Sequence, residues 1–210
     1  MTQEERYTMM TETPVSRLIP RLAVPTIISM LVTAIYNMAD TFFVSQINTS
    51  ASAAVGIIFS IMAMIQALGF TLGMGGGNCI SRTLGKREEE LAERIAATSF
   101  FTALAVGTLM AVFGLAFLDK LVIFLGATET IAPYARDYAG YILLGAPIMM
   151  GSFVMNNLLR SQGYAFYAML GITTGGILNM ILDPVFIFGM GLGITGAAMA
   201  TVLSQCISFG

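Results

Sequence analysis

The sequence predicts an all-α, polytopic membrane protein built as a bundle of six transmembrane helices. Hydrophobic residues make up 56% of the 210 residues and charged residues only 10%, whereas a soluble domain carries about 25% charged residues. The apolar residues also gather into six long segments, and a helix that spans a bilayer needs roughly 20 of them. With so few polar side chains to face water, we expect the surrounding solvent to be lipid.

The six apolar segments account for most of the chain. We expect residues 1–17 to form a cytoplasmic N-terminal segment and residues 18–210 to form one six-helix transmembrane lobe. The helices are expected at residues 18–47, 53–80, 91–118, 133–159, 165–188 and 194–210. The last of them would extend only about 25 Å at the rise of an α-helix, less than a bilayer core of about 30 Å. We therefore expect this helix to be truncated.

Most Lys and Arg residues fall in loops on one side of the predicted bundle. Cytoplasmic loops carry an excess of these residues, and only Lys120 and Arg136 fall on the opposite side. The others are Arg6, Arg17, Arg21, Arg82, Lys86, Arg87, Arg94 and Arg160. The pattern predicts a multi-pass protein of the inner (plasma) membrane with a cytoplasmic N-terminus.

Residue types that several other functions need are scarce or absent. The sequence contains no histidine, and its two cysteines, Cys79 and Cys206, lie far apart. A disulfide framework or a CxxC motif is therefore not indicated, and imidazole is missing both as a catalytic base and as a zinc ligand. The net charge of −2 does not favour nucleic acid as a partner. We expect neither an enzyme nor a cofactor.

Two carboxylates lie inside the predicted spans, Asp40 in the first and Asp183 in the fifth. An ionised side chain at bilayer depth costs several kcal/mol, so an acid there indicates a functional site. Both helices run outward in the predicted topology, and both acids lie roughly 8–11 Å below the outer boundary at helical rise. Equal depth predicts that the two acids share one site.

Helical spacing gives each acid polar neighbours. Tyr36 lies four residues before the first acid and Asn179 four residues before the second, so each pair shares a helix face; Asn37, three residues before the first acid, is a weaker candidate. Thr201 follows the small-residue run GITGAAMAT, which permits close helix approach. Oxygen ligands of this kind suit Na⁺ or a shared proton, and either cation would relieve the repulsion between the carboxylates. The residues alone do not distinguish the two.

Three prolines lie within the predicted spans and away from the starts of the helices: Pro25, Pro147 and Pro184. Proline removes a backbone donor and leaves the carbonyl one turn earlier without its partner. Polar backbone at membrane depth is tolerated where it lines a cavity. Each proline is therefore predicted to be either a conformational hinge or a static kink filled by its neighbours.

Four sequence motifs, in this order, resemble the N-terminal half of a multidrug and toxic compound extrusion (MATE) transporter. They are PTIISMLVTAIYNMADTFFVSQ, GNCISRTLGK, LRSQG and GGILNMILDPVFIFGMGLGITGAAMATVLSQ. The resemblance covers essentially the whole chain. It implies one lobe of a two-lobe transporter, in which two six-helix lobes enclose a V-shaped cleft and cationic or amphiphilic drugs leave in exchange for Na⁺ or H⁺.

The resemblance also implies roles for particular residues. The cation site of the family's N-terminal lobe matches Asp40, Asn179, Asp183 and Thr201. By the resemblance, Tyr36 and Asn156 correspond to polar positions that line the cavity of the same lobe. Asn37 and Tyr138 are also expected in the substrate cavity. The expected partners are amphipathic or cationic small molecules, membrane lipid, and either a C-terminal lobe that this sequence lacks or a second copy of the chain.

Two alternative functions compete with this one. A lipid-linked oligosaccharide flippase of the same superfamily would need basic cavity residues for phosphate, and the helix interiors in the outer half of the predicted bundle carry no Lys or Arg. An intramembrane aspartyl protease also uses two membrane acids that share a proton. The Tyr-Asp and GxGD motifs of that family are absent, because Asp40 follows Ala39 and Asp183 follows Leu182.

Overall fold

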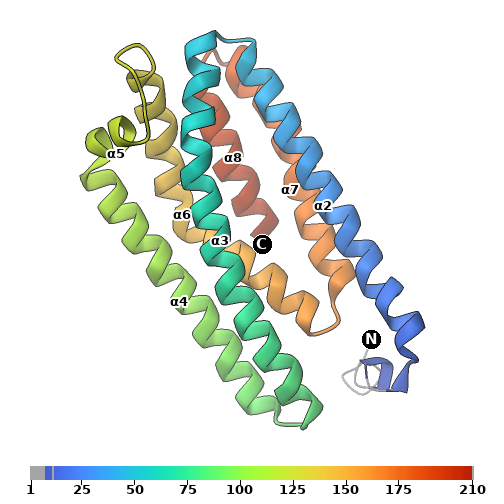
Figure 1. The fold of residues 1–210 in the computed structure, drawn as a ribbon. Helices are drawn as coiled ribbons and strands as arrows, with labels where there is room; N and C mark the ends of the chain where they lie inside the picture. The colour runs from blue at the N-terminus through green and yellow to red at the C-terminus, as the bar shows by residue number, and fades with distance from the viewer. Residues whose placement is uncertain (1–7, 11, 210) are drawn as a thin grey trace.

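All regular structure in the computed structural model, which describes residues 8–10 and 12–209, is helical. The elements are α2 (Val15–Ser45), α3 (Thr49–Gly85), α4 (Glu89–Ala116), α5 (Leu118–Phe124), α6 (Ala132–Ser161), α7 (Ala165–Pro184), the π-helix η1 (Val185–Gly189) and α8 (Gly193–Phe209) (Figure 1). The predicted fold class, an all-α polytopic membrane protein, is confirmed.

Five helical segments in the described residues are long and apolar enough to cross a membrane: α2, α3, α4, α6, and α7 continued by η1. They match the first five predicted segments with ends shifted by a few residues. The sixth predicted segment is α8, a shorter apolar helix. The first helix begins at Val15, slightly earlier than the predicted start at residue 18.

Two features of the helical architecture were not predicted. A short helix, α5, follows α4 after Phe117, whose φ of −116° and ψ of 25° depart from helical values. Its Asp119 accepts a charge-assisted hydrogen bond from Arg136 of α6 at 2.7 Å. The second feature is η1, which continues α7 directly after Pro184 as a π-helix. Both depend on local backbone geometry, to which hydrophobic periodicity is insensitive.

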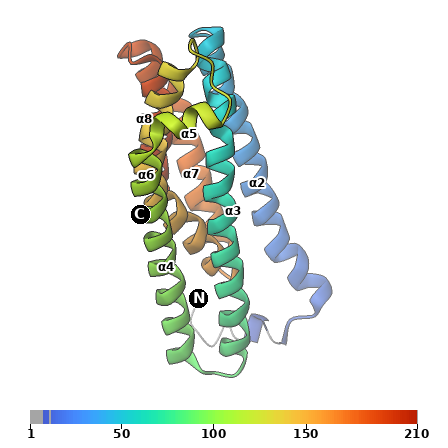
Figure 2. The same ribbon diagram turned by 60° about the vertical axis from the view of Figure 1, so that its left-hand side comes forward.

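Helix α6 forms the centre of the bundle. In its most apolar stretch 61% of the residues are buried, against 6% for α2. It packs against α3, α4 and α8 (Figures 1 and 2). Small residues permit this close packing: a Cβ on Gly107 of α4 would come within 2.6 Å of the Pro147 Cα, and one on Gly145 within 2.7 Å of a Val202 methyl. Such contacts between small residues hold helices together in lipid, where the hydrophobic effect does not.

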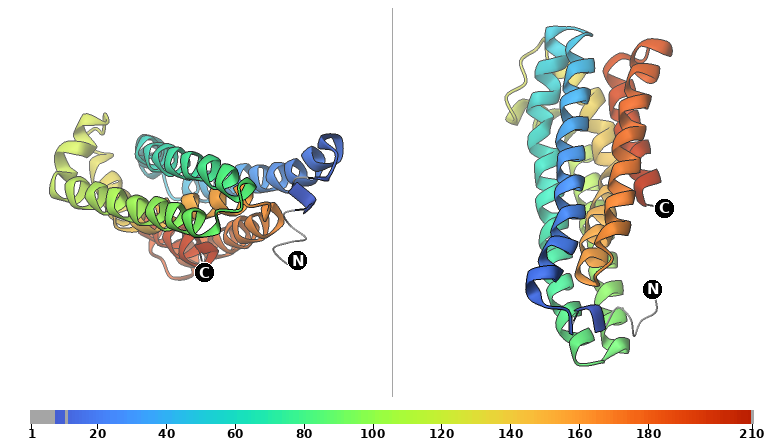
Figure 3. Two further views of the ribbon diagram at one scale, coloured as in Figure 1. Left: turned by 90° about the horizontal axis from the view of Figure 1, so that it is seen from below. Right: turned by 90° about the vertical axis from the view of Figure 1, so that its right-hand side faces the viewer.

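Helices α2 and α7 pack side by side and run in the same direction (Figure 3). A Cβ on Gly176 of α7 would meet the Tyr36 ring at 3.1 Å and a Val32 methyl at 3.0 Å, so the missing side chain lets α2 approach. This contact places the two predicted acid-bearing faces next to each other.

Candidate cation site and adjoining cavity

The two membrane acids lie at the same level of the bundle. Asp40 is about one turn before the end of α2 at Ser45, and Asp183 is at a similar distance from the end of η1 at Gly189. Asp40 is 8% exposed and Asp183 is fully buried. The two carboxylates interact electrostatically. The two acids thus lie near enough to act on each other, and that they share one cation site stays a prediction.

Asn179 connects the second acid to α8. Its Nδ2 donates to Asp183 Oδ1 at 3.3 Å and lies 3.5 Å from Thr201 Oγ1, which accepts the second hydrogen bond. Asn179 is 2% exposed and Thr201 5%. Helix α8 reaches this position because it carries glycine where it passes η1: a Cβ on Gly196 would come within 2.8 Å of the Phe186 backbone. Hydrogen bonds thus link Asn179, Asp183 and Thr201, three of the four residues predicted for cation binding, and the fourth, Asp40, interacts electrostatically with Asp183.

Three oxygens of this cluster are buried and accept no hydrogen bond from any residue that the structure describes: Asp40 Oδ1, Asn179 Oδ1 and Asp183 Oδ2. Buried polar atoms are almost always paired, and leaving one unpaired costs roughly 1–3 kcal/mol. Two carboxylates and an amide oxygen form a hard-oxygen donor set without nitrogen or sulfur ligands. Such a set fits an alkali cation or a proton better than a transition metal.

Tyr138 of α6 borders the acids. Its ring is fully buried and its hydroxyl donates to the Met62 sulfur at 3.8 Å. Both acids act on it electrostatically, and Thr201 lies close to its hydroxyl. Tyr138 therefore closes the cation cluster on the side of α6.

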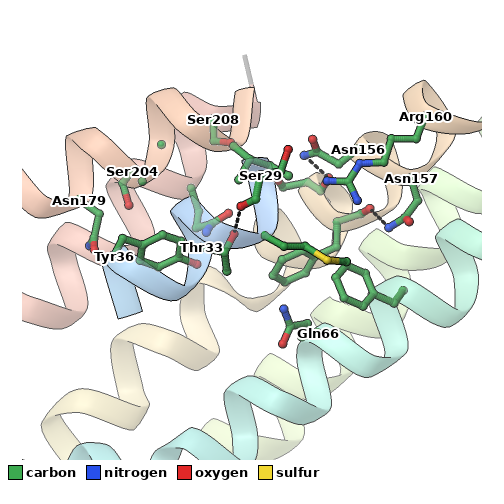
Figure 4. A pocket seen from close by; sticks show the side chains of 18 residues that line it. Ser29, Thr33, Tyr36, Gln66, Asn156, Asn157, Arg160, Asn179, Ser204 and Ser208 are labelled. Carbon is green, nitrogen blue, oxygen red and sulfur yellow. Dashed lines mark hydrogen bonds between the residues drawn. The ribbon is translucent and has the colours of Figure 1, made fainter. Parts of the chain in front are cut away.

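A cavity of about 170 Å³ adjoins the cluster. Side chains from α2, α3, α6, α7 and α8 line it (Figure 4). Tyr36, Asn156 and Asn179 belong to its wall. Asn179 thus faces both the cavity and the acids.

The four residues predicted to line the substrate cavity divide into two groups. Tyr36 and Asn156 lie in the cavity wall, and Tyr138 and Asn37 do not. Tyr138 does not reach the cavity, because its ring packs in the core beside the acids. Asn37 is half-buried on α2, outside this wall.

Several polar cavity residues were not predicted. Ser29, Gln66, Ser204 and Arg160 all line the cavity, and Ser29 and Ser204 are almost fully buried. The signal that could have found them is a polar side chain inside an apolar segment. The sequence indicates only that Arg160 helps to set the membrane orientation of the chain, because it lies just after a predicted helix and was expected in a solvated loop.

The three prolines have different surroundings. Close to Pro25 in α2, the Ser29 hydroxyl donates to the Pro25 carbonyl at 2.8 Å, and the Thr26 hydroxyl donates to a carbonyl one turn earlier at 2.9 Å. Hydroxyls that bond back in this way tend to bend a helix. Pro147 is held against the backbone of α4 at Gly107. Pro184 leads directly into η1, and π-helical turns are frequent at functional sites.

Comparisons with known proteins agree with this architecture. The MatE family model matches residues 25–185. The multidrug export protein MepA of Staphylococcus haemolyticus is 28% identical over 98% of this chain and 46% of its own length. The FAD transporter of Shewanella oneidensis is 31% identical over 93% of this chain and 44% of its own. The chain therefore spans less than half the length of these relatives.

Solved structures show the same likeness. An outward-facing conformation of a multidrug resistance MATE family transporter superposes with a TM-score of 0.91 at 35% identity. The superposition covers 97% of this chain and 45% of that one. These matches correspond to one lobe of a MATE transporter, and they favour neither the flippase nor the protease alternative.

Proposed function

The chain belongs to the MatE family, and we propose that it forms one lobe of a cation-coupled antiporter that exports amphipathic organic compounds. In this proposal the cation occupies the cluster of Asp40, Asn179, Asp183 and Thr201, and it is Na⁺ or H⁺. The lobe acts together with a second lobe and is not an enzyme. Residues 1–17 and the N-terminus lie on the cytoplasmic side of the plasma membrane.

One observation carries the proposal: three buried acceptor oxygens of the cluster have no hydrogen-bond partner among the described residues. They come from two different helices, α2 and α7. A cation between them would satisfy oxygens on both helices and relieve the repulsion between the two carboxylates. Binding would therefore stabilise the arrangement in which α2 packs closely against α7.

The coupling to substrate runs through Tyr36. This residue lies one turn before Asp40 on α2, lines the cavity, and packs against Gly176 of α7. A shift of α2 relative to α7 moves the Tyr36 ring within the cavity wall. Pro25 lies three turns before Tyr36 and provides the bend about which α2 moves, because its nitrogen donates no hydrogen bond to the preceding turn. Occupation of the cation cluster thus changes the shape of the cavity and releases its contents.

The test is ion-driven efflux by the lobe within a two-lobe transporter in membrane vesicles. Asp40→Asn and Asp183→Asn should each abolish efflux driven by a sodium or proton gradient, since each removes a charge from the cluster. Asp137→Asn, the same change at an exposed position of α6, serves as the matched control and should retain it. Normal coupled efflux in both cluster variants would refute the proposal.

A further inference from the structure

The cavity carries a charge opposite in sign to that of the neighbouring acids. Among the described residues that line it there is no Asp or Glu side chain, and Arg160 is the one charged residue of that lining. The Arg160 guanidinium extends from the last turn of α6 toward the cavity (Figure 4). Its Nε is buried without a hydrogen-bond partner, and Arg160 forms no ion pair within the described part of the chain.

A structural role at the end of α6 does not account for this arrangement. A basic side chain in the last turn of a helix interacts favourably with the helix dipole, and it does so equally well from solvent. Burying a guanidinium nitrogen without a partner costs free energy, more than for a neutral group. Within the described residues nothing supplies an acceptor for this donor, and a ligand in the cavity would supply one.

An unpaired acceptor lies one helical turn away from this donor. Asn156 precedes Arg160 by four residues, so their side chains share a face of α6. The Asn156 Nδ2 donates to the Ser152 carbonyl at 3.0 Å, and its Oδ1 is buried without a donor in the described part of the chain. The cavity wall thus offers one cationic donor and one neutral acceptor at adjacent positions.

An aromatic surface completes the pocket. The Phe70 and Phe153 rings, both in the cavity wall, meet edge to face with centroids 5.5 Å apart. The volume of about 170 Å³ is close to that of a cavity of about 150 Å³ known to hold benzene. The space therefore suits one aromatic ring.

We propose that this cavity binds an aromatic organic phosphate, with the phosphate at Arg160 and Asn156 and the ring against Phe70 and Phe153. The inference rests on the proposed export function and names the substrate class of its cavity. A singly protonated phosphate ester combines anionic oxygens, which accept from Arg160, with one P–OH, which donates to Asn156. A sulfonate lacks the donor, and an ammonium carries the wrong charge.

The test compares three one-ring probes: phenyl phosphate, benzenesulfonate and benzylammonium. Their binding to the purified chain is measured by calorimetry in nonionic detergent, below the second pKa of a phosphate ester of about 6. Phenyl phosphate should bind at least about tenfold more tightly than benzylammonium, and Arg160→Gln should weaken it about ten- to a hundredfold, the range for a hydrogen bond to a charged group. Arg160→Lys should restore part of the affinity, and Asn156→Leu should abolish the preference for phosphate over sulfonate.

Arg94→Gln is the matched control. Arg94 is an exposed residue of α4 that pairs with Glu90 at 2.7 Å, so its loss makes the same charge change away from the cavity and should leave binding unaltered. If Arg160→Gln does not fold, Arg160→Lys and Asn156→Leu decide the question. Equal or tighter binding of benzylammonium, or unchanged phenyl phosphate affinity in the Arg160 variants, would overturn the proposal.

Phosphatidate in mixed micelles separates the two natural sources of a phosphate group. Displacement of phenyl phosphate by phosphatidate assigns the site to a lipid headgroup, and no displacement assigns it to a water-soluble compound; both results support a phosphate site. The binding assay needs no ion gradient and leaves the acids unchanged. If phenyl phosphate binds the Arg160 variants unchanged while Asp40→Asn still loses coupled efflux, the phosphate site alone is overturned. If the Arg160 variants lose binding while Asp40→Asn keeps coupled efflux, the ion coupling alone is overturned.

Discussion

Asn179→Leu is the substitution that tests the cation cluster most directly. Leucine nearly preserves the side-chain volume, so the change removes polarity without opening a large cavity. It eliminates the hydrogen bonds to Asp183 and Thr201, at 3.3 and 3.5 Å, together with the unpaired Oδ1. Both bonds are long and therefore individually weak.

The magnitude follows from the unpaired Oδ1, which the substitution removes as an oxygen ligand for a bound Na⁺. The interaction of a polar group with a charged group contributes roughly 1.5–3 kcal/mol. Since about 1.4 kcal/mol is tenfold in affinity, the loss of this oxygen weakens sodium binding. We expect a weakening between about tenfold and a hundredfold.

The assay is ²²Na⁺ binding to the purified chain, with proton uptake on mixing measured in parallel. Asn78→Leu, at an exposed position of α3, makes the same chemical change away from the cluster and should bind cations normally. Circular dichroism and size-exclusion chromatography establish that each variant is folded. A folded Asn179→Leu chain with unchanged affinity for both cations would show that Asn179 does not contribute to the site.

Three further predictions concern packing, competition and bending. Gly107→Ala should lower the free energy of unfolding by about 1–3 kcal/mol, because its Cβ would fall 2.6 Å from the Pro147 backbone. The control is Gly75→Ala, whose Cβ would meet no atom within 4 Å and which should be neutral or slightly stabilising in thermal unfolding. Equal effects of the two substitutions would contradict the packing argument. Sodium affinity should fall as pH is lowered, because protons compete for the same carboxylates; isotope binding that stays constant from pH 8 to 5 would exclude this competition. Pro25→Ala should keep cation binding at Asp40 but reduce gradient-driven efflux, because alanine supplies the backbone N–H that proline lacks at the bend. Full efflux by this variant in vesicles would show that Pro25 is not a hinge.

The pairing of the two acids was accessible from the sequence because membrane depth follows from counting residues along a helix. Asp40 and Asp183 each stand in an apolar segment with a countable distance to its outer end, and Asn179 shares a face with Asp183 through the four-residue spacing. Thr201 is different: no spacing rule relates α8 to α7, so its place beside Asn179 was expected from the family resemblance and the small-residue run before it. The structure supplies the distance.

Other features had no comparable signal. Tyr138 resembles a cavity residue by type, and only the packing of α6 against its neighbours decides that its ring is enclosed beside the acids. The π-helix after Pro184 depends on how the helical backbone adjusts where the proline lacks an N–H donor, and the sequence does not specify that adjustment. Arg160 looked like a loop residue, and only the structure places it in the last turn of α6 and in the lining of the cavity.

The sequence by itself determined the fold class, the spans and the presence of two costly acids, because hydropathy and the energetic cost of charge in lipid depend on composition along one segment at a time. The tertiary structure decided which polar atoms face one another. That outcome depends on contacts between helices distant in sequence, such as Gly176 against Tyr36 and Gly196 against η1. These contacts set the gap in which a cation would be held and the cavity into which Arg160 extends.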